Sequence, residues 1–358
     1  MKKIILFSLL LLNYCCFSQE VMRTGTPNTI GMLSARDLEQ YQQPELQSLV
    51  KELYAAKTDA EKTRINKRLL RTFEGFLQVP ISFEINYDSL KKDIQLLRAP
   101  DNSFRIINWH VEKSDGTFEY YGFIQSKFVQ YKKHGPFRKI RIETMQLYPL
   151  MDKSAEIKNP DNAISDNKKW YGMRYYRIIE SKTKTRNYYT LLGWDGNDKF
   201  SQKKIIDVLS FDNNGVPHFG ADIFNFQKRY PKRVIFEYSA TCTMPLKYSE
   251  KKDSIIFGHL APIQPQLEGQ FQYYCTDMSY DGFGFRKGKW NYGADIKATN
   301  DKDEKDKLYH DPHDRSTGSD KSQDYKTVME TSAPTGDGNK VKKRDRVKKP
   351  KQPAQPKE

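Results

Sequence analysis

The spacing of apolar residues changes once along the chain, from a helical period to a strand period. Three helices are predicted before residue 100: the first starts near Pro44, the second follows the capping-box pair Thr58 and Glu61, and the third, shorter helix begins at Asp88. The apolar positions that recur every three or four residues are Leu46, Leu49, Val50 and Leu53, then Ile65, Leu69, Phe73 and Phe76, and last Leu90, Ile94 and Leu97.

From about Ser103 onward apolar and polar residues alternate, which is typical of strands. Three hairpins are predicted, with strands at 104–111 and 117–125, at 174–179 and 187–192, and at 205–211 and 216–219. Further strands are expected at 233–244, 254–260, 270–276, 283–285 and 290–292, while the polar stretch 151–169 reads as a long loop. Short turns without intervening helices indicate a mainly β fold: an antiparallel meander sheet, sandwich or barrel-like domain preceded by a short helical segment.

The two ends of the chain differ from this middle part. Residues 1–18 combine Lys2 and Lys3, a short apolar run and a small residue at Ser18, which indicates a secretory signal peptide. The rival interpretation is a lipoprotein anchored through Cys15 or Cys16. After about Lys297 apolar residues almost vanish, and a disordered charged tail, basic at its end, is expected over 298–358. The predicted organisation is therefore 1–18 signal, 19–100 flexible lead-in and helical segment, 101–297 β domain and 298–358 tail.

The predicted export limits the expected location of the protein and the expected state of its cysteines. No segment after the signal is apolar for the roughly 20 residues that a spanning helix needs, so no transmembrane segment is expected in the mature chain. The expected location is the periplasm, or an outer-membrane-associated or extracellular position. Only Cys242 and Cys275 follow the signal, and both fall on the apolar phase of a predicted strand. In an oxidising compartment this pattern favours a disulfide over two separately buried thiols.

The chain carries a net charge of +15, and nine of its Lys and Arg residues (seven Lys, two Arg) lie between 340 and 358. Because an exported protein rarely meets nucleic acid, we expect none as a partner. An anionic envelope surface or another envelope protein is the expected partner.

Two polar loops contain the candidate ligand-binding residues. The first has Trp194, Asp195, Asn197 and Asp198, whose clustered oxygens resemble calcium ligands but also an ordinary turn. The second has Asp277, Tyr280 and Asp281 around Ser279, with His218 or His259 as a distant candidate base. No cofactor is expected, and calcium at the first loop is the alternative to an ordinary turn. No metal site is predicted either, since His310 and His313 lack companion ligands.

The aromatic residues offer a further hypothesis, a platform for sugar rings or peptides. It would be built from Trp109, Trp170, Trp194 and Trp290 together with paired tyrosines such as Tyr120 and Tyr121. Because neighbouring residues on a strand point to opposite faces, half of these tyrosines should belong to the core.

Several strings together resemble an uncharacterised family of exported envelope proteins of Gram-negative bacteria. The resemblance spans most of residues 40–296 and implies an intact exported domain without implying an activity. The strings are Tyr87-Asp88-Ser89-Leu90-Lys91, Pro100-Asp101 with Phe104-Arg105-Ile106, Leu192-Gly193-Trp194-Asp195-Gly196-Asn197, Ile256-Phe257-Gly258-His259-Leu260-Ala261-Pro262, Ser279-Tyr280-Asp281-Gly282-Phe283 and Lys287-Gly288-Lys289-Trp290.

No motif in the sequence assembles a catalytic constellation, so no catalytic residue is assigned. The leading hypothesis is a non-enzymatic binding or scaffolding protein whose basic tail is an electrostatic tether. The alternative is an envelope hydrolase acting on glycan or peptide through paired carboxylates among Asp195, Asp198, Asp277 and Asp281.

Overall fold

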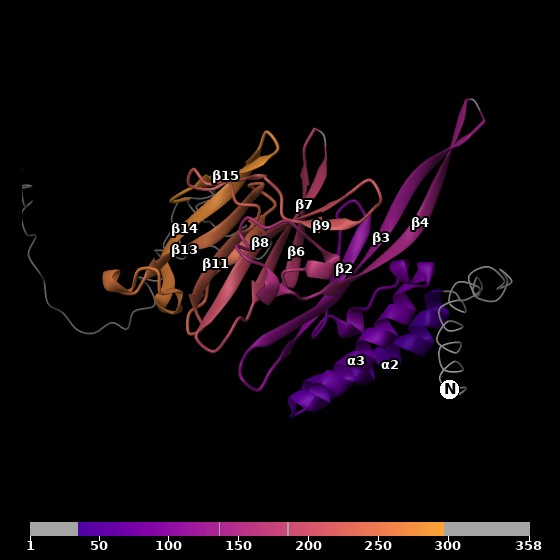
Figure 1. Ribbon diagram of the computed structural model, residues 1–358, viewed down its shortest axis with the longest axis horizontal. Coiled ribbons are helices and arrows are strands. Elements are labelled where there is room, and N and C mark those ends of the chain that lie inside the picture. The colour runs from indigo at the N-terminus through magenta and orange to yellow at the C-terminus, as the bar shows by residue number, and fades with distance from the viewer. Residues whose placement is uncertain (1–34, 136, 185, 297–358) are drawn as a thin grey trace, which may run out of the picture. The chain divides into compact units, whose positions relative to one another are not determined.

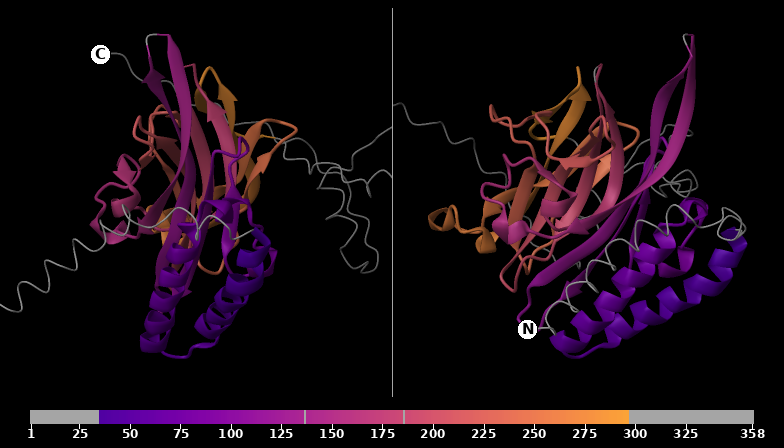
Figure 2. Two further views of the ribbon diagram at one scale, coloured as in Figure 1. Left: turned by 90° about the vertical axis from the view of Figure 1, so that its right-hand side faces the viewer. Right: turned by 45° about the vertical axis from the view of Figure 1, so that its right-hand side comes forward.

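The computed structural model describes residues 35–296, apart from positions 136 and 185 (Figure 1). In this part of the chain a helix pair and three β-sheets lie in successive layers (Figure 2). Three buried apolar clusters lie between helices and first sheet, between first and second sheet, and between second and third sheet. The fold is mainly β with antiparallel sheets after a helical segment, which confirms the predicted fold class.

Helices α2 (Ala35–Ala55) and α3 (Asp59–Leu77) form the first layer. The capping box is confirmed, because the Thr58 side chain accepts from the Glu61 backbone N–H and the Glu61 carboxylate reaches back to the cap. The position of Pro44 was predicted wrongly, since it lies inside α2 and not in its first turn. The residues before Leu46 carry few apolar side chains, so periodicity gave no sign of the earlier turns.

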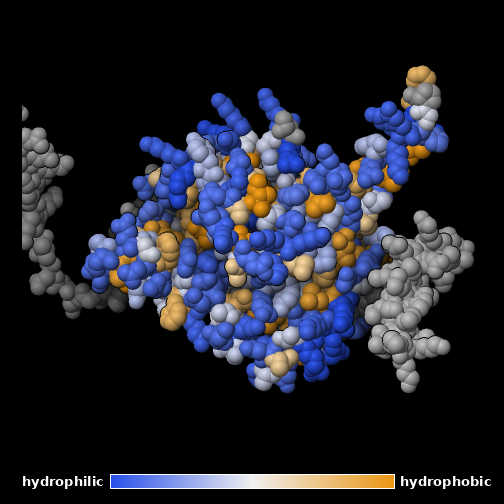
Figure 3. Space-filling model, in the orientation of Figure 1, coloured by the Kyte–Doolittle hydropathy of each residue, from blue (hydrophilic) through white to orange (hydrophobic). Residues whose placement is uncertain are grey.

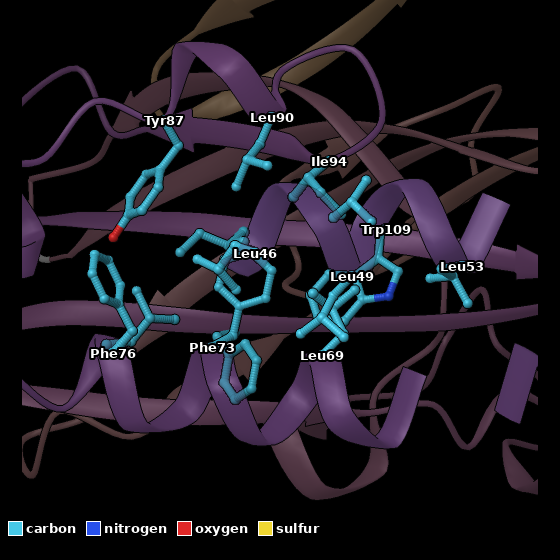
Figure 4. Packing of buried hydrophobic residues seen from close by; sticks show 14 of the residues in the cluster. Leu46, Leu49, Leu53, Leu69, Phe73, Phe76, Tyr87, Leu90, Ile94 and Trp109 are labelled. Atoms are coloured by element: carbon cyan, nitrogen blue, oxygen red, sulfur yellow. The ribbon is translucent and has the colours of Figure 1, made fainter. Parts of the chain in front are cut away.

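The first core attaches this helix pair to the first sheet (Figure 4). Leu46 and Leu49 of α2 and Leu69 and Phe73 of α3 surround Trp109, whose ring centre lies 5.4 Å from that of Phe73. The Trp109 indole N–H donates to the Asn66 side chain at 2.8 Å, so the one polar atom of this buried ring is satisfied.

The segment between the helices and the sheet contains the 3₁₀ turns η2 (Pro80–Glu84) and η3 (Asp88–Leu90), followed by strand β1 (Gln95–Arg98). The predicted third helix is therefore wrong beyond its first turn. Leu97, which fits the helical period, instead lies opposite Ile106 in an antiparallel ladder. Pairing with a neighbouring strand has overridden the local helical pattern.

The first sheet has the order β1-β2-β3-β4, with β2 (Phe104–Glu112), β3 (Phe118–His134) and β4 (Arg138–Met151). The hairpin of β2 and β3 is confirmed. Strand β4 was not predicted, and β3 continues nine residues past Gln125. The outer parts of both strands are exposed on both faces, although Ile140 and Ile142 of β4 alternate with charged residues.

The second sheet has the order β5-β9-β8-β7-β6, and β11 (Val234–Ser239) also pairs with β8. Its other strands are β5 (Ser165–Asp166), β6 (Arg174–Lys182), β7 (Asn187–Asp195), β8 (Ser201–Phe211) and β9 (Pro217–Phe219). Both predicted hairpins are confirmed. Because this sheet is covered on both sides, Leu191 enters one core and its neighbour Leu192 enters the other.

The third sheet has the order β10-β15-β14-β13-β12, and β10 runs parallel to β15. Its strands are β10 (Phe224–Asn225), β12 (Leu246–Ser249), β13 (Ser254–Pro262), β14 (Tyr274–Arg286) and β15 (Lys289–Gly293). Short 3₁₀ turns η4 (Ser154–Glu156), η5 (Asn167–Lys169), η6 (Pro265–Leu267) and η7 (Phe271–Tyr273) lie in the connections.

Cys242 and Cys275 are bridged, with their Cα atoms 5.7 Å apart. This separation agrees with the predicted disulfide. The reasoning about strands was only half right, because Cys275 lies on β14 but β11 ends at Ser239, before Cys242.

The predicted signal peptide, the flexible lead-in at 19–32 and the charged tail lie outside the described residues. Within residues 35–296, neither helix has the length and apolar character needed to cross a bilayer.

Candidate functional site

The candidate residues of the first polar loop lie at the end of β7, against the first sheet. The Tyr120 hydroxyl donates to Asp195 Oδ1 at 2.9 Å and accepts the backbone N–H of Gly196 at 2.8 Å. Asp195 Oδ1 also accepts the backbone N–H of Asn197. The carboxylate is 7% exposed, and burial raises its pKa against the opposing effect of the Lys203 charge. Asp195 thus joins a turn of the second sheet to a strand of the first.

A lysine ammonium already interacts with the oxygens that resemble calcium ligands. Lys203 Nζ lies 2.6 Å from Asn197 Oδ1 and 3.7 Å from Asp195 Oδ2. Asp198 Oδ1 accepts the backbone N–H groups of Phe200 and Ser201, as in an ordinary turn. Calcium at this loop would have to displace Lys203, and within the described residues no group of three metal-ligating side chains converges.

Trp194 stands apart from the other three tryptophans because its ring is only half-buried. Its ring meets His110 and Phe118 edge-on, with both centres 5.5 Å away. Trp109, Trp170 and Trp290 are at most 1% exposed and belong to the cores, so they cannot form a binding platform for sugar rings.

The second group of candidates lies in β14, which the sequence had indicated as a loop. Asp281 is 4% exposed, and its Oδ2 lies 2.9 Å from Nδ1 of His259 on β13 and accepts the Tyr292 hydroxyl at 2.7 Å. This hydrogen bond raises the pKa of His259. Tyr280, the remaining candidate here, is half-buried next to this pair.

Sequence alone did not place a histidine near Ser279, but the strand register does. Gly258 pairs with Tyr280 and Leu260 with Thr276, so His259 lies opposite the three-residue bulge 277–279. The Ser279 hydroxyl donates to Asp277 Oδ1 at 2.7 Å, while His259 bonds to Asp281. The hydrogen bonds of Ser279 and His259 therefore go to two different carboxylates, unlike those of a serine triad.

The four candidate carboxylates therefore have local structural partners in two separate places. Asp195 and Asp198 hold the β7–β8 turn, Asp277 holds the bulge, and Asp281 holds His259. A glycosidase-type mechanism needs two carboxyl groups on either side of one substrate bond. These four carboxylates are not arranged as one such pair across the two loops.

The sequence reasoning missed the most prominent exposed feature, the outer part of the β3–β4 hairpin at residues 130–142, here called the ribbon. It extends away from the layered body (Figures 1 and 2), and its described residues between 130 and 141 are all exposed. Five cations and no Asp or Glu occur within it: Lys132, Lys133, Arg138, Lys139 and Arg141. Phe137, beside the turn, is 100% exposed.

A sequence signal for the ribbon existed. Gly135 and Pro136 form a dipeptide that marks turns, and cations stand on both sides of it. Gly135 has φ +76°, a value that favours glycine. Ile140 and Ile142 also alternate with charged residues in this segment, as in a strand. Figure 3 shows hydrophilic residues and hydrophobic patches along the projection, with a hydrophobic end.

In comparisons with protein-family models, curated proteins and solved structures, nothing matches this chain.

Proposed function

We propose that this protein is a non-enzymatic binding protein of the bacterial envelope that attaches to an anionic lipid surface. The observation that carries the proposal is the ribbon, an exposed projection with five cations, of which Arg141 is paired with Glu143 at 2.7 Å. Each Lys or Arg close to an anionic bilayer contributes on the order of 1 kcal/mol to binding. The other four, Lys132, Lys133, Arg138 and Lys139, support attachment without a shaped pocket.

The register of the ribbon gives a second argument. Lys133 lies directly opposite Lys139. Like charges facing each other across two strands are destabilising, and an isolated two-stranded hairpin is marginally stable in water. A surface of negative charge removes this repulsion, so the ribbon is better suited to contact with an anionic partner than to free solution.

The apolar end favours lipid over other polyanions. Phe137 is fully exposed, and Tyr131 and Ile140 are 66% and 38% exposed on the same projection. Full burial of a Phe side chain contributes about 1.5–3 kcal/mol. An aromatic ring at the turn, followed by cations along the shaft, matches the order of acyl region and charged headgroups at a bilayer surface.

The basic end of the chain, residues 340–358, would add to the same attraction as a second, electrostatic tether. Its nine Lys and Arg residues need no fixed conformation for this role. Unlike the ribbon, residues 340–358 carry no aromatic residue that could enter the apolar layer.

Cosedimentation with vesicles containing phosphatidylglycerol tests the proposal. Replacing Lys132, Lys133, Arg138 and Lys139 by Gln should weaken binding roughly 100- to 1,000-fold, because each charge contributes about 1 kcal/mol and 1.4 kcal/mol is tenfold. The matched control removes four cations from the exposed face of α3 by replacing Arg64, Lys67, Arg68 and Arg71 with Gln. An equal loss in both variants would show that only net charge matters and would overturn a specific role of the ribbon.

Two further proteins separate the contributions. Phe137→Ser should weaken vesicle binding about tenfold and make the remainder more sensitive to salt, because screening acts on the charges and not on the buried ring. A chain truncated after Lys297 should keep the part of the affinity that the ribbon supplies. If truncation alone abolishes binding, the tail is the tether and the ribbon is not.

A further inference from the structure

Lys204 of β8 is a half-buried lysine in an aromatic environment. Its direct neighbours across the two adjacent strands are Trp194 of β7 and Phe236 of β11. Directly opposite residues of antiparallel strands share one face of the sheet, so these two residues flank the lysine. On the same face Ile206, the next residue but one along β8, belongs to the core between the second and third sheets. Lys204 therefore lies at the margin of an apolar core.

The ammonium of Lys204 has no anionic partner in these surroundings. Its nitrogen lies 5.0 Å from the centre of the Tyr176 ring, and among the described residues no group forms a hydrogen bond or an ion pair with it. Arg174, which lies opposite Trp194 in the same row, is a second cation. Burial raises the pKa of the nearby phenols Tyr176 and Tyr238, so both are neutral at pH 7. Within this row no group balances the charge of the lysine.

These surroundings favour the neutral amine over the ammonium. Loss of contact with water disfavours the charged form, and burial lowers the pKa of Lys204 accordingly. An aromatic face attracts an ammonium, but it does not replace the hydrogen bonds that water donates and accepts. The free amine is the nucleophilic form of lysine, and desolvation in an apolar pocket is one way in which proteins activate it.

The preceding residue, Lys203, is a matched control within the same strand. It is also half-buried, but its side chain points to the other face of the sheet. There Asp195 and Glu237 lie opposite it on the two adjacent strands. Its ammonium lies 2.6 Å from Asn197 Oδ1. Lys203 must give up these contacts before it can react, whereas Lys204 has none of this kind to lose.

We propose that Lys204 is a reactive amine that condenses with small aldehydes to form an imine. The Nζ lone pair adds to the carbonyl carbon, and one N–H proton passes to the carbonyl oxygen. The resulting hydroxyl then leaves as water with the second N–H proton, and a C=N bond remains. This modification site is independent of the lipid attachment proposed for the ribbon.

Reductive trapping on the full chain tests the proposal. Propanal is supplied at limiting concentration together with cyanoborohydride, which reduces each imine to a stable secondary amine, and peptide mass spectrometry locates the modified lysines. At pH 7 Lys204 should be modified roughly tenfold faster than Lys203, because a desolvated ammonium releases its proton more readily. Equal or slower modification of Lys204 would overturn the proposal.

The pH dependence separates a reactive amine from one that is only more accessible. The ratio of the Lys204 rate to the Lys203 rate should fall between pH 7 and pH 10, because an ordinary lysine, with a pKa of about 10.4, gains free amine over this range. A ratio that stays the same at both pH values would show that access alone sets the preference, and the proposal would fail.

Two substitutions of one residue test the role of the aromatic row. Trp194→Glu places a carboxylate directly opposite Lys204, as Asp195 lies opposite Lys203, and should remove the preference for Lys204. Trp194→Phe keeps a ring at this position and should retain the preference. Circular dichroism checks that both variants are folded. If folded Trp194→Glu reacts at Lys204 as fast as the parent protein, the surroundings do not set the reactivity and the proposal is wrong.

Discussion

Two histidines show how much a residue's chemistry depends on its surroundings. His110 is largely buried near the rings of Phe118 and Trp194, and burial together with the charge of Arg174 lowers its pKa to about 4. His259 is more exposed, and its hydrogen bond to Asp281 raises its pKa. The ring of His110 is therefore neutral at pH 7, whereas that of His259 is biased towards the charged form.

His110 should make the fold sensitive to acid. Its neutral ring is favoured in the folded state, so stability is fully present above the ordinary pKa of about 6.5 and is lost as the pH falls towards 4. A shift of this size corresponds to a loss on the order of 3 kcal/mol. Urea unfolding at pH 7 and pH 4 should show that His110→Phe loses less stability than the parent protein.

His259→Gln is the control, because the pKa of His259 is shifted in the opposite direction. Stability from His259 is present below about pH 6.5 and is lost as the pH rises. The prediction would be contradicted if His110→Phe lost as much free energy of unfolding between pH 7 and pH 4 as the parent protein.

Among the secondary-structure elements, the strands of the third sheet depend on a covalent link as well as on packing. The disulfide joins Cys242, just after β11 of the second sheet, to Cys275 on β14 of the third sheet. The loop that it closes contains β12 and β13. The bond therefore fastens two layers that otherwise hold together through apolar contacts, including those of Phe236 with Phe257.

Removing this link should destabilise the fold. The cysteines are 33 residues apart, and a loop of that length corresponds to about 3–4 kcal/mol of lost unfolded-chain entropy. The double variant Cys242→Ser, Cys275→Ser should unfold at correspondingly lower urea concentration. A reducing agent should shift the parent protein in the same direction and leave the variant unaffected. Two free sulfhydryls in the oxidised mature protein would contradict the bond itself.

At the scale of the whole molecule, the described layers contain the three apolar clusters, and the sequence after Lys297 offers almost nothing to bury. Burial of apolar surface is the main favourable contribution to folding, so the stability of the protein should reside in the layered part. The nine cations of 340–358 add charge and no apolar surface that folding could bury.

Truncation after Lys297 should therefore leave thermal unfolding unchanged. Differential scanning calorimetry of the protein with and without 298–358 measures this directly. Because 1 kcal/mol shifts the midpoint of a domain of this size by about 2–4 °C, even a weak stabilising contact of the tail would be detected. A clear drop in the midpoint on truncation would show that the tail packs against the layers.

The sequence by itself determined the features that depend on near neighbours. The capping box at Thr58 and the hairpin turns are set within a few residues of chain, and the structure agrees with both. The cysteine pair was also predictable, because only Cys242 and Cys275 follow the predicted signal peptide and the expected oxidising location favours a bond.

The tertiary structure alone decided which faces are covered and which side chains meet. Buried Arg233 lies 2.9 Å from Asp207, and His259 meets Asp281, through strand pairings that no local pattern encodes. The outer parts of β3 and β4 are exposed on both faces, and local pattern did not reveal this exposure. A cleft of about 470 Å³ lies between the first and second sheets, where segments distant in sequence meet. The local sequence pattern indicates that one face of a strand or helix is apolar. Which element packs against that face, and which faces stay exposed, depends on the packing of layers that are distant in sequence.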